Sequence, residues 1–370
     1  MSMALEFRAD HLGSFLRPTS VKQARAAIQA GAINAEQLQE VEDNAILEVV
    51  ERQRSIGFNI FSDGEFRRSG FQNDFMDSVA GFVHTDRPVV RIWKGPGGDP
   101  EAQGTDNVVG AKLQQTRRLT GVQTAFLKAH APGPVKMTIP SPNQFPALVF
   151  QTGVTDPFYA TRSDLLGEIT RILKGEVAAL IEDGVDYIQV DAPRYSYFVD
   201  PKWRQVLQDN GQDPEDALEQ FIAADNAILE GAQRAGAVAA IHLCRGNNQS
   251  KWYAEGGYEP LAEKAFNLLN VDRFLLEYDT DRSGNFEPLR FVPKNKIVVL
   301  GLVSTKDARM ESQDDLLRRI DEASKFVPIE NLTLSPQCGF ASMPAGNIMT
   351  EDQQWRKMEL VLETARKAWS

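Results

Sequence analysis

Short apolar runs alternate with amphipathic stretches along most of this chain. Apolar runs of strand length, bounded by polar or turn-forming residues, predict buried β-strands. They lie at residues 5–12, 59–62, 135–140, 187–191, 238–242, 273–277, 296–302 and 331–334. Helical periodicity is found at residues 21–32, 35–56, 112–131, 163–182, 215–235 and 352–368. The pattern therefore predicts strands and helices in alternation.

Alternating strands and helices favour an α/β fold with a parallel sheet. Eight such units predict a closed (β/α)₈ barrel, the TIM barrel, and we expect residues 1–370 to form this single domain. A doubly wound open sheet is the alternative. No G-x-G-x-x-G follows the first predicted strand, which argues against a dinucleotide-binding start to such a sheet.

One insertion, near residues 83–110, interrupts the repeat. It is rich in Gly, Pro and Asp, above all at residues 94–100, and residues 89–93 could form an arm of a hairpin. A long irregular segment inside a compact domain is typically a lid or another functional loop. Disorder is the alternative.

Composition restricts the class of protein. With 42% hydrophobic and 25% charged residues, the 370-residue chain has the values of an ordinary globular protein. Its formal net charge of −11 argues against nucleic acid as a partner. No apolar run approaches the roughly 20 residues of a membrane span, and the first residues lack the apolar core of a secretory signal. We expect a cytoplasmic protein without a membrane partner, and a homo-oligomer is compatible with these values.

Unusual polar residues gather at the ends of the predicted strands. In a parallel barrel the carboxyl ends of all strands meet at one rim, where enzymes of this architecture place their sites. Side chains far apart in sequence would then face one cavity. The residues in these positions are Ser14, Glu65, Asp191, His242, Cys244, Glu277, Lys306 and Cys338.

His242 and Cys244 point to a metal site. Side chains two apart on a strand face the same way, so an imidazole and a thiolate would lie side by side. Zn²⁺ prefers such nitrogen and sulfur ligands. Cys338 is the only other cysteine, and Glu277 is an acidic candidate for the fourth position. An exchangeable Glu277 would make the zinc catalytic, able to hold a substrate thiol as thiolate.

Two other interpretations of the cysteines are open at this point. Free cysteines are commonly small buried hydrophobic residues. A disulfide between Cys244 and Cys338 would require an oxidising compartment, which nothing at the N-terminus indicates.

Other residues at the rim suit a small amino acid. Glu65 and Asp191 are anionic and could bind an ammonium group, and the backbone N–H groups of Gly13 and Ser14 could hold a carboxylate. The alternatives are a surface or helix-capping role for Glu65 and a turn role for Asp191. At least two of the nearby arginines are expected in solvent, and His11 is a weaker candidate for substrate contact. These arginines are Arg17, Arg67 and Arg68.

Taken together, these residues resemble the cobalamin-independent methionine synthase family, in particular its catalytic C-terminal barrel. The resemblance spans almost the whole chain. It is carried by His11-Leu12-Gly13-Ser14-Phe15, Asp63-Gly64-Glu65-Phe66, Gln189-Val190-Asp191-Ala192-Pro193, His242-Leu243-Cys244, Glu277 and Pro336-Gln337-Cys338-Gly339.

The resemblance implies a zinc-dependent thiol methyltransferase on a TIM barrel. It implies that His242, Cys244, Glu277 and Cys338 form the metal shell. It further implies that Glu65 and Asp191 bind the ammonium group of homocysteine, and that the Gly13–Ser14 backbone binds its carboxylate.

Three features depart from the family pattern. The chain has no room for the second, N-terminal barrel that helps the full-length family to bind folate. Lys306 stands where the family places a histidine thought to relay a proton, which makes Lys306 the candidate catalytic residue. The aromatic folate-stacking block after the third strand is replaced by residues 138–145. The chain thus resembles the short, single-barrel branch.

The expected reaction is methyl transfer to homocysteine, with 5-methyltetrahydrofolate or another compound as the methyl donor. One alternative is a zinc-dependent alkyltransferase of the same family that acts on another thiol or electrophile, similar to epoxyalkane:coenzyme M transferase. The other is a barrel that binds a ligand without turnover.

Overall fold

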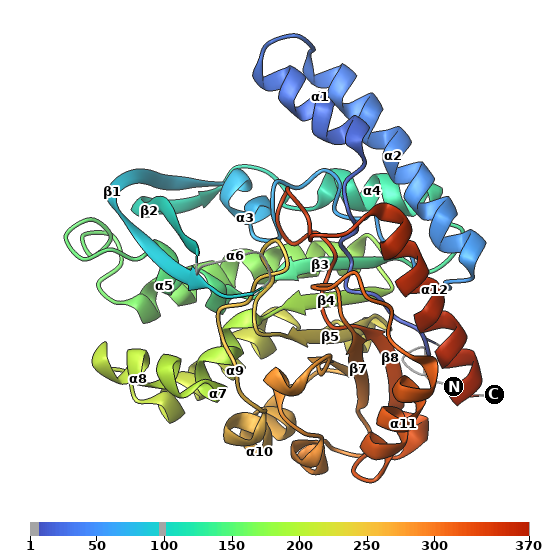
Figure 1. The fold of residues 1–370 in the computed structure, drawn as a ribbon. Helices are drawn as coiled ribbons and strands as arrows, with labels where there is room; N and C mark the ends of the chain where they lie inside the picture. Colours follow the sequence, from blue (N-terminus) through green and yellow to red (C-terminus); the bar gives the residue numbers. More distant parts are fainter. Residues whose placement is uncertain (1–6, 96–100, 370) are drawn as a thin grey trace.

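A six-stranded parallel sheet lies at the centre of the molecule (Figure 1). The structure is a computed structural model that describes residues 7–95 and 101–369, without the side chains of residues 87–90 and 101–105. Each strand pairs with the next one along the chain. The strands are β3 (Lys136–Pro140), β4 (Tyr187–Asp191), β5 (Val238–Leu243), β6 (Arg273–Glu277), β7 (Ile297–Val303) and β8 (Leu332–Pro336). The predicted α/β class with a parallel sheet is confirmed.

The first two predicted strands appear as bridged segments instead. Ala9 pairs with Leu334 of β8, Ser14 pairs with Gly64, and Phe61 pairs with Val135 just before β3. The two edges of the sheet are therefore connected through residues 8–14 and 61–64, which is the connectivity expected of an eightfold barrel.

The prediction of full strands at residues 5–12 and 59–62 was wrong for the described residues, which begin at residue 7. The backbone leaves the extended region soon after each bridge, at Gly13 (φ 96°) and at Gly64 and Glu65 (φ 69° and 59°). A strand that turns this early can make few ladder hydrogen bonds.

Helices pack around the sheet, and the two longest begin with reciprocal side-chain caps. α2 (Ala35–Ile56) starts at Asn34 with a capping box and ends at Gly57 in the left-handed region, which confirms the predicted helix. α6 (Arg162–Glu182) starts with the same box at Thr161. The other helices of eight or more residues are α1 (Thr19–Gln29), α4 (Gly121–His130), α8 (Pro201–Asp209), α9 (Pro214–Ile228), α10 (Glu259–Leu268), α11 (Gln313–Ser324) and α12 (Glu351–Ala368).

Both faces of the sheet are buried, because alternate residues of each strand face opposite ways. Ala239 and Ile241 of β5 belong to the large core under the helices. Val238 and Ala240 belong to a smaller core on the other face. The smaller core consists of Phe7, Leu12, Ile60, Tyr187, Val238, Ala240, Leu275, Ile297 and Val299. Burial on both faces explains why the strands could be recognised in the sequence as nearly continuous apolar runs.

The insertion forms a two-stranded antiparallel ribbon of β1 (Val79–Trp93) and β2 (Glu101–Gln115), seen to the left in Figure 1. The hairpin interpretation is confirmed, and disorder is excluded for the described residues. The Gly- and Pro-rich stretch 96–100 lies outside them. The expected helix at 112–131 was wrong at its start, because β2 continues through Gln115 and α4 begins at Gly121.

Several contacts attach the ribbon to the rest of the molecule, including one in β2 and one just after β1. The backbone N–H of Leu113 in β2 donates to the hydroxyl of Tyr159 (2.8 Å), just before α6. The N–H of Lys94 donates to the carbonyl of Trp252, and the N–H of Trp252 donates back to Lys94, both at 2.7 Å. The second contact joins the end of β1 to the loop that follows β5, the segment that carries Cys244.

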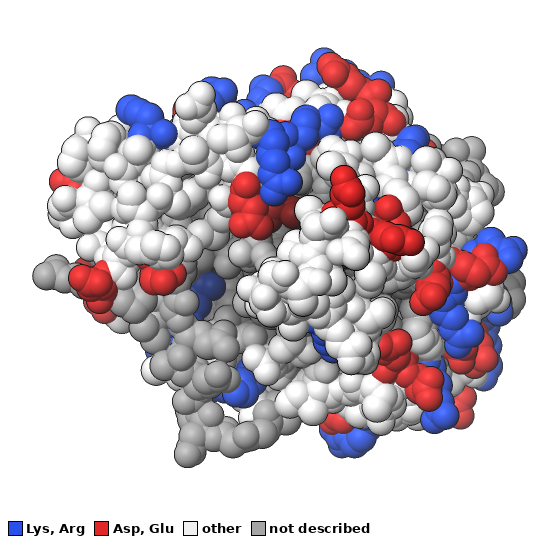
Figure 2. Space-filling model, turned by 90° about the horizontal axis from the view of Figure 1, so that it is seen from above, with Lys and Arg blue, Asp and Glu red and all other residues white. Residues whose placement is uncertain are grey.

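Charged side chains of both signs are interspersed on the face seen from above in Figure 2. Among the described residues, no helix combines the length and apolar character needed to cross a membrane.

A buried ion cluster lies among the strands. Asp10 accepts hydrogen bonds from Lys136 and from the hydroxyl of Tyr187 (2.9 Å), and its carboxylate lies 3.7 Å from Arg273. The three charged residues are at most 1% exposed. Burial alone would raise the pKa of Asp10, but Lys136 and Arg273 outweigh it and lower that pKa to about 2.

Replacing Asp10 with Asn should destabilise the fold by about 3–5 kcal/mol, because two buried cations lose their anion. In the wild-type protein, the pKa of Asp10 is lowered, so its contribution is present above the unfolded pKa and is lost as pH falls from about 4 toward about 2. Urea unfolding at several pH values measures both effects. Glu230→Gln, which breaks the exposed pair with Lys174, is the matched control and should change stability little. A loss for Asp10→Asn no larger than the control would contradict this account.

Candidate metal centre and substrate pocket

Strand register brings the candidate side chains to one edge of the sheet. Asp191, the last residue of β4, pairs with His242 in β5. Cys244 directly follows β5, and Cys338 lies two residues beyond β8. Parallel strands end at the same side of a sheet, so groups almost one hundred positions apart in the chain meet there.

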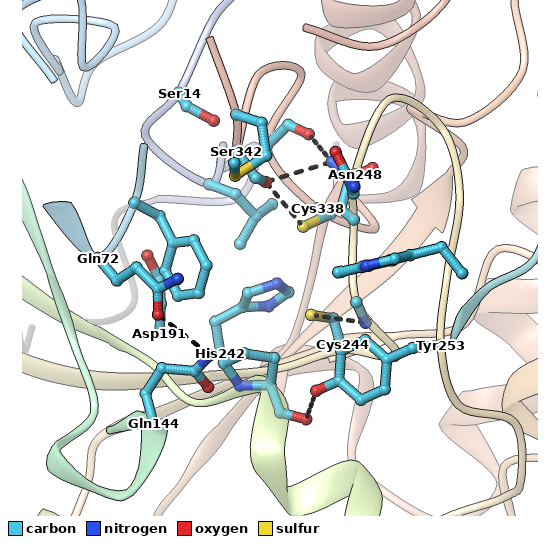
Figure 3. Close-up of a pocket in the computed structure, with 18 of the residues that line it drawn as sticks. Ser14, Gln72, Gln144, Asp191, His242, Cys244, Asn248, Tyr253, Cys338 and Ser342 are labelled. Atoms are coloured by element: carbon cyan, nitrogen blue, oxygen red, sulfur yellow. Dashed lines mark hydrogen bonds between the residues drawn. The ribbon is translucent and has the colours of Figure 1, made fainter. Parts of the chain in front are cut away.

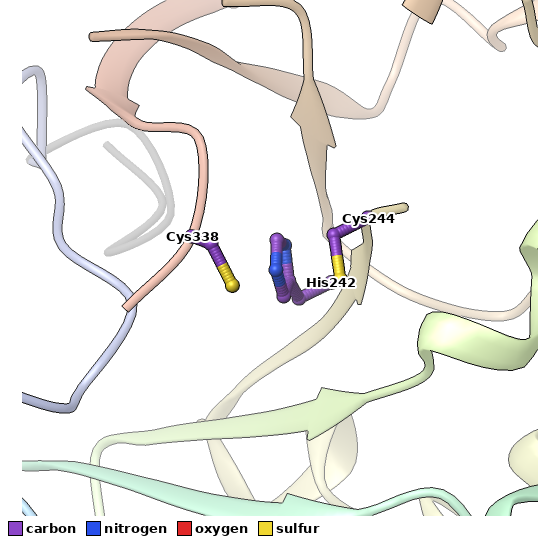
Figure 4. Close-up of side chains that lie close together, drawn as sticks. All are labelled: His242, Cys244 and Cys338. Carbon is purple, nitrogen blue, oxygen red and sulfur yellow. The ribbon is translucent and has the colours of Figure 1, made fainter. Parts of the chain in front are cut away.

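His242, Cys244 and Cys338 form one buried group. One ligand atom of each lies within 4.8 Å of those of the others (Figure 4). The imidazole Nδ1 of His242 lies 3.1 Å from the carbonyl oxygen of Leu275, to which it can donate. Its Nε2 is buried without a hydrogen-bond partner among the described residues. A buried nitrogen without a partner destabilises the folded protein, and binding to a metal ion would remove that penalty.

The three groups also bias one another's protonation. Hydrogen bonding from Cys244 lowers the pKa of Cys338 well below its usual value, with His242 acting in the same direction against burial. The Cys338 bond and burial raise the pKa of Cys244. Cys338 is thus the first sulfur to become a thiolate, the form that binds metals. One nitrogen and two sulfurs, with room for another ligand, fit a zinc ion better than a harder cation.

Glu277, predicted as the fourth ligand, is not part of this group. Its buried carboxylate accepts hydrogen bonds from the backbone N–H of Arg245 (2.8 Å) and from the guanidinium of Arg282 (2.7 and 3.0 Å). Arg282 bonds only Oε1 of Glu277, and the Arg245 N–H bonds Oε2. Its role as a ligand stays a prediction.

Lys306, predicted as the catalytic residue, is buried beside the centre but does not line the pocket. Its ammonium group donates to the carbonyl of Gly246 (2.6 Å) and to the side chain of Asn247 (3.2 Å). Lys306 therefore holds the loop that follows Cys244. A direct catalytic role stays a prediction.

A pocket lies above the three metal-ligand candidates, and its empty space, including the mouth, is about 960 Å³. Its wall is mostly apolar and carries a few polar groups, as is typical of sites that bind small molecules. Most of the residues predicted from the sequence line it, and Figure 3 shows His242 between Asp191 on one side and Cys244 and Tyr253 on the other. These residues are Ser14, Glu65, Asp191, His242, Cys244 and Cys338.

Glu65 and Asp191 contribute negative charge to the pocket. Glu65 is buried and accepts a hydrogen bond from the hydroxyl of Thr138 (2.6 Å), with Arg68 at 3.4 Å. Burial raises the pKa of Glu65. Asp191 keeps some accessible surface in the pocket, yet desolvation raises its pKa to about 7, and Glu65 adds to the shift. A cation between the two carboxylates would relieve both effects.

Close backbone contacts hold the loops of this rim together. The guanidinium of Arg17 donates to the carbonyls of Glu65 (3.0 Å) and Ala341 (3.2 Å), so it links the loop of Glu65 to the loop after Cys338. A Cβ at Gly339 would lie 2.0 Å from the Ser14 hydroxyl oxygen, so a larger residue there would displace the Ser14 side chain. The N–H of Gly13 donates to His11 Nδ1 (3.3 Å), which leaves it less available to a carboxylate than expected.

Two sequence-based expectations about neighbouring residues were wrong. The arginines near the rim are not in solvent: Arg17 and Arg68 are at most 2% exposed, and the side chain of Arg67 is 8% exposed. Arg17 donates to the carbonyl of Glu65, Arg68 forms an ion pair with Asp74, and Arg67 forms one with Glu42 of α2. His11 does not line the pocket, and its Nε2 lies 3.1 Å from the carbonyl of Ile60.

Several pocket residues were missed from the sequence. Arg91 and Trp93 reach the pocket from the ribbon, Tyr253 from the loop after β5, and Gln144 from the turn after β3. Gln144 lies in the stretch already noted as differing from the family. For the others no local pattern distinguishes a pocket side chain from a surface one, because their positions depend on how the ribbon folds back.

Comparison with known proteins agrees with this geometry. The family model described as "Cobalamin-independent synthase, Catalytic domain" matches residues 7–358. The uncharacterized protein YxjH of Bacillus subtilis is 38% identical over 98% of this chain and 95% of its own length. The methionine synthase of Sulfurisphaera tokodaii is 24% identical over 90% of this chain and 86% of its own. A crystal structure of a putative vitamin-B12 independent methionine synthase from Listeria monocytogenes superposes with a TM-score of 0.75 at 28% identity, over 98% of both chains.

Replacing Cys338 with Ser should abolish tight zinc binding. The change keeps the size of the side chain but removes the soft thiolate. Zinc affinity should therefore fall by more than about 10- to 100-fold, the loss that is typical when a residue hydrogen-bonded to a metal ligand is removed. Metal content after dialysis, followed by competition with a coloured chelator, measures it. Met343→Leu, a change elsewhere in the pocket wall, is the control and should keep about one zinc per chain. Unchanged zinc affinity in Cys338→Ser would rule out this centre.

Proposed function

The chain belongs to the family of cobalamin-independent methionine synthase catalytic domains, and we propose that it is a zinc-dependent methyltransferase that converts homocysteine to methionine. The observation that carries the proposal is the buried His242, Cys244 and Cys338 group at the base of a pocket that also contains two carboxylates. The methionine synthase name of the Sulfurisphaera relative supports the same reaction.

His242, Cys244 and Cys338 would hold the metal, and the unpartnered Nε2 and the low pKa of Cys338 support this assignment. Zinc in that position supplies positive charge that keeps a substrate thiol deprotonated near neutral pH. The carbonyl of Leu275 fixes the imidazole by accepting from Nδ1, so that Nε2 is the nitrogen turned to the ion.

Glu65 and Asp191 would bind the ammonium group of homocysteine. Their mutual repulsion and raised pKa values make this part of the pocket favourable for a cation. Ser14 lines the same part of the pocket and would face the carboxylate end of the amino acid. An amino acid bound there would have its sulfur directed toward His242 and the two cysteines.

In the reaction, the thiol of homocysteine loses its proton and its sulfur forms a bond to the methyl carbon. The bond between this carbon and the donor breaks, and the donor keeps the electron pair. The apolar wall of Leu12, Leu148 and Met343 would help to exclude water from the transfer.

Glu65→Gln and Asp191→Asn should each weaken homocysteine binding to the zinc-loaded protein by about 10- to 100-fold, because a charge-assisted hydrogen bond is lost. Calorimetric titration measures the affinity. The comparison ligand is 4-mercaptobutyrate, which has the thiol and the carboxylate but no ammonium group, and its weaker binding should not change in either variant. Equal losses for both ligands would contradict an ammonium site.

Turnover gives an independent test of the reaction. The wild-type gene should restore growth without methionine to a bacterial strain that lacks its own methionine synthases, and Cys338→Ser should not, because the metal centre is lost. Glu230→Gln, an exposed change outside the pocket, is the control and should restore growth as the wild type does. Purified protein that methylates another thiol, such as coenzyme M, at a higher kcat/KM than homocysteine would replace the proposed acceptor.

A further inference from the structure

Two buried arginines lie together at the ribbon side of the pocket. Arg91 of β1 lines the pocket and is 8% exposed, and Arg194, which follows β4, is 2% exposed. Both guanidinium groups lie close to the phenol of Tyr197, and their charges and hydrogen bonds lower its pKa against the effect of burial. The Nε and Nη2 atoms of Arg91 are buried and have no hydrogen-bond partner within residues 7–95 and 101–369.

Both guanidinium groups lie over aromatic rings, whereas other buried arginines pair with carboxylates. The Cζ of Arg91 lies 5.0 Å from the ring centre of Tyr253, and that of Arg194 lies 4.7 Å from the ring centre of Tyr197. By contrast, Arg282 forms an ion pair with Glu277 at 2.7 Å. In the described part of the chain, no carboxylate forms an ion pair with Arg91 or Arg194.

Burying two like charges without an anion is costly, since cation–π contacts replace only a part of their hydration. Arg194 donates from Nε to the carbonyl of Gln144 (3.0 Å). Two donors of Arg91, Nε and Nη2, are buried without a partner among the described residues, and Arg91 is one of the residues that line the pocket. Such a pair of donors in fork geometry suits a carboxylate or a phosphate.

The surroundings of Arg91 add a flat apolar surface. Trp93 and Tyr253 pack edge to face, with ring centres 5.2 Å apart, and both line the pocket. Gly246, two residues after Cys244, allows this approach because a Cβ there would lie 2.4 Å from the Tyr253 ring. Figure 3 shows Tyr253 on the opposite side of His242 from Asp191. The pocket thus has an anionic part and a cationic, aromatic part, with the metal-ligand candidates between them.

We propose that Arg91, supported by Arg194, binds a carboxylate or phosphate group of the second substrate, whose body lies against Trp93 and Tyr253. Identifying this second substrate as the methyl donor rests on the proposed function, but the anion site does not. The donor would then be an anionic molecule with an aromatic or other flat portion next to its charged group. Its methyl group would approach from the side opposite to the ammonium site.

Small aromatic anions test the site without knowledge of the donor. In calorimetric titrations of the zinc-loaded full chain, benzoate or phenyl phosphate should bind at least about 10-fold more tightly than neutral benzamide, because the charge-assisted bonds to Arg91 require an anion. The preferred anion identifies the group as a carboxylate or a phosphate. Equal binding of benzamide and both anions would overturn the proposal without any variant.

Variants assign the selectivity to Arg91. Arg91→Gln should reduce anion affinity by about 10- to 100-fold and leave benzamide binding unchanged, and Arg91→Lys should retain part of the anion affinity. Lys94→Gln is the matched control, since it removes a positive charge from the same ribbon at a side chain that is 53% exposed and lies outside the pocket. Unchanged anion binding in Arg91→Gln, or an equal loss in Lys94→Gln, would contradict the assignment.

Zinc content and homocysteine affinity, measured on the same samples, separate the two proposals. Homocysteine binding without selectivity for anions would overturn the anion site alone. Anion selectivity that depends on Arg91, in a protein that binds neither zinc nor homocysteine, would overturn the proposed function and leave the anion site standing.

Discussion

The close approach of an imidazole and two sulfurs in a buried position is the constraint on which the site depends. Their ligand atoms lie within 4.8 Å of one another, and the Nε2 of His242 has no partner among the described residues. Apolar side chains could fill such a position more stably. A cluster of donor atoms kept there instead is typical of a group that gains its stability from a bound metal.

The two sides of the pocket differ in the sign of their buried charges. Glu65 and Asp191 are close enough to repel each other, which prepares that part of the pocket for a cation. Arg91 and Arg194 place two positive charges on the ribbon side, over the rings of Tyr253 and Tyr197, and this part of the pocket would favour an anion. In each case the unfavourable burial of like charges is present before the ligand arrives, so that a ligand of opposite charge gains binding free energy from relieving it. With both proposed sites in place, the pocket would select its ligands by charge at both ends.

The ribbon contributes side chains to the pocket from outside the parallel sheet. β1 and β2 lie outside the parallel sheet, and their contacts near the site include the pairing of Lys94 with Trp252 and the packing of Trp93 against Tyr253. A segment attached in this way can change its side chains without disturbing the strand ends that carry His242 and Cys244. Arg91 and Trp93 are such side chains.

The sequence by itself determined the features that depend on local periodicity and on side-chain chemistry. Six strands, α2 and the donor set of His242, Cys244 and Cys338 could be recognised, because both faces of the sheet are buried and the strand ends carry the polar residues. Only the tertiary structure decided which groups are free to act. Glu277 is engaged by Arg282, Lys306 is held by Gly246 and Asn247, and Arg91 enters the pocket from a ribbon whose own sequence indicates only a hairpin. These outcomes depend on contacts between segments far apart in the chain, and no local pattern records which of several oppositely charged partners a side chain will meet.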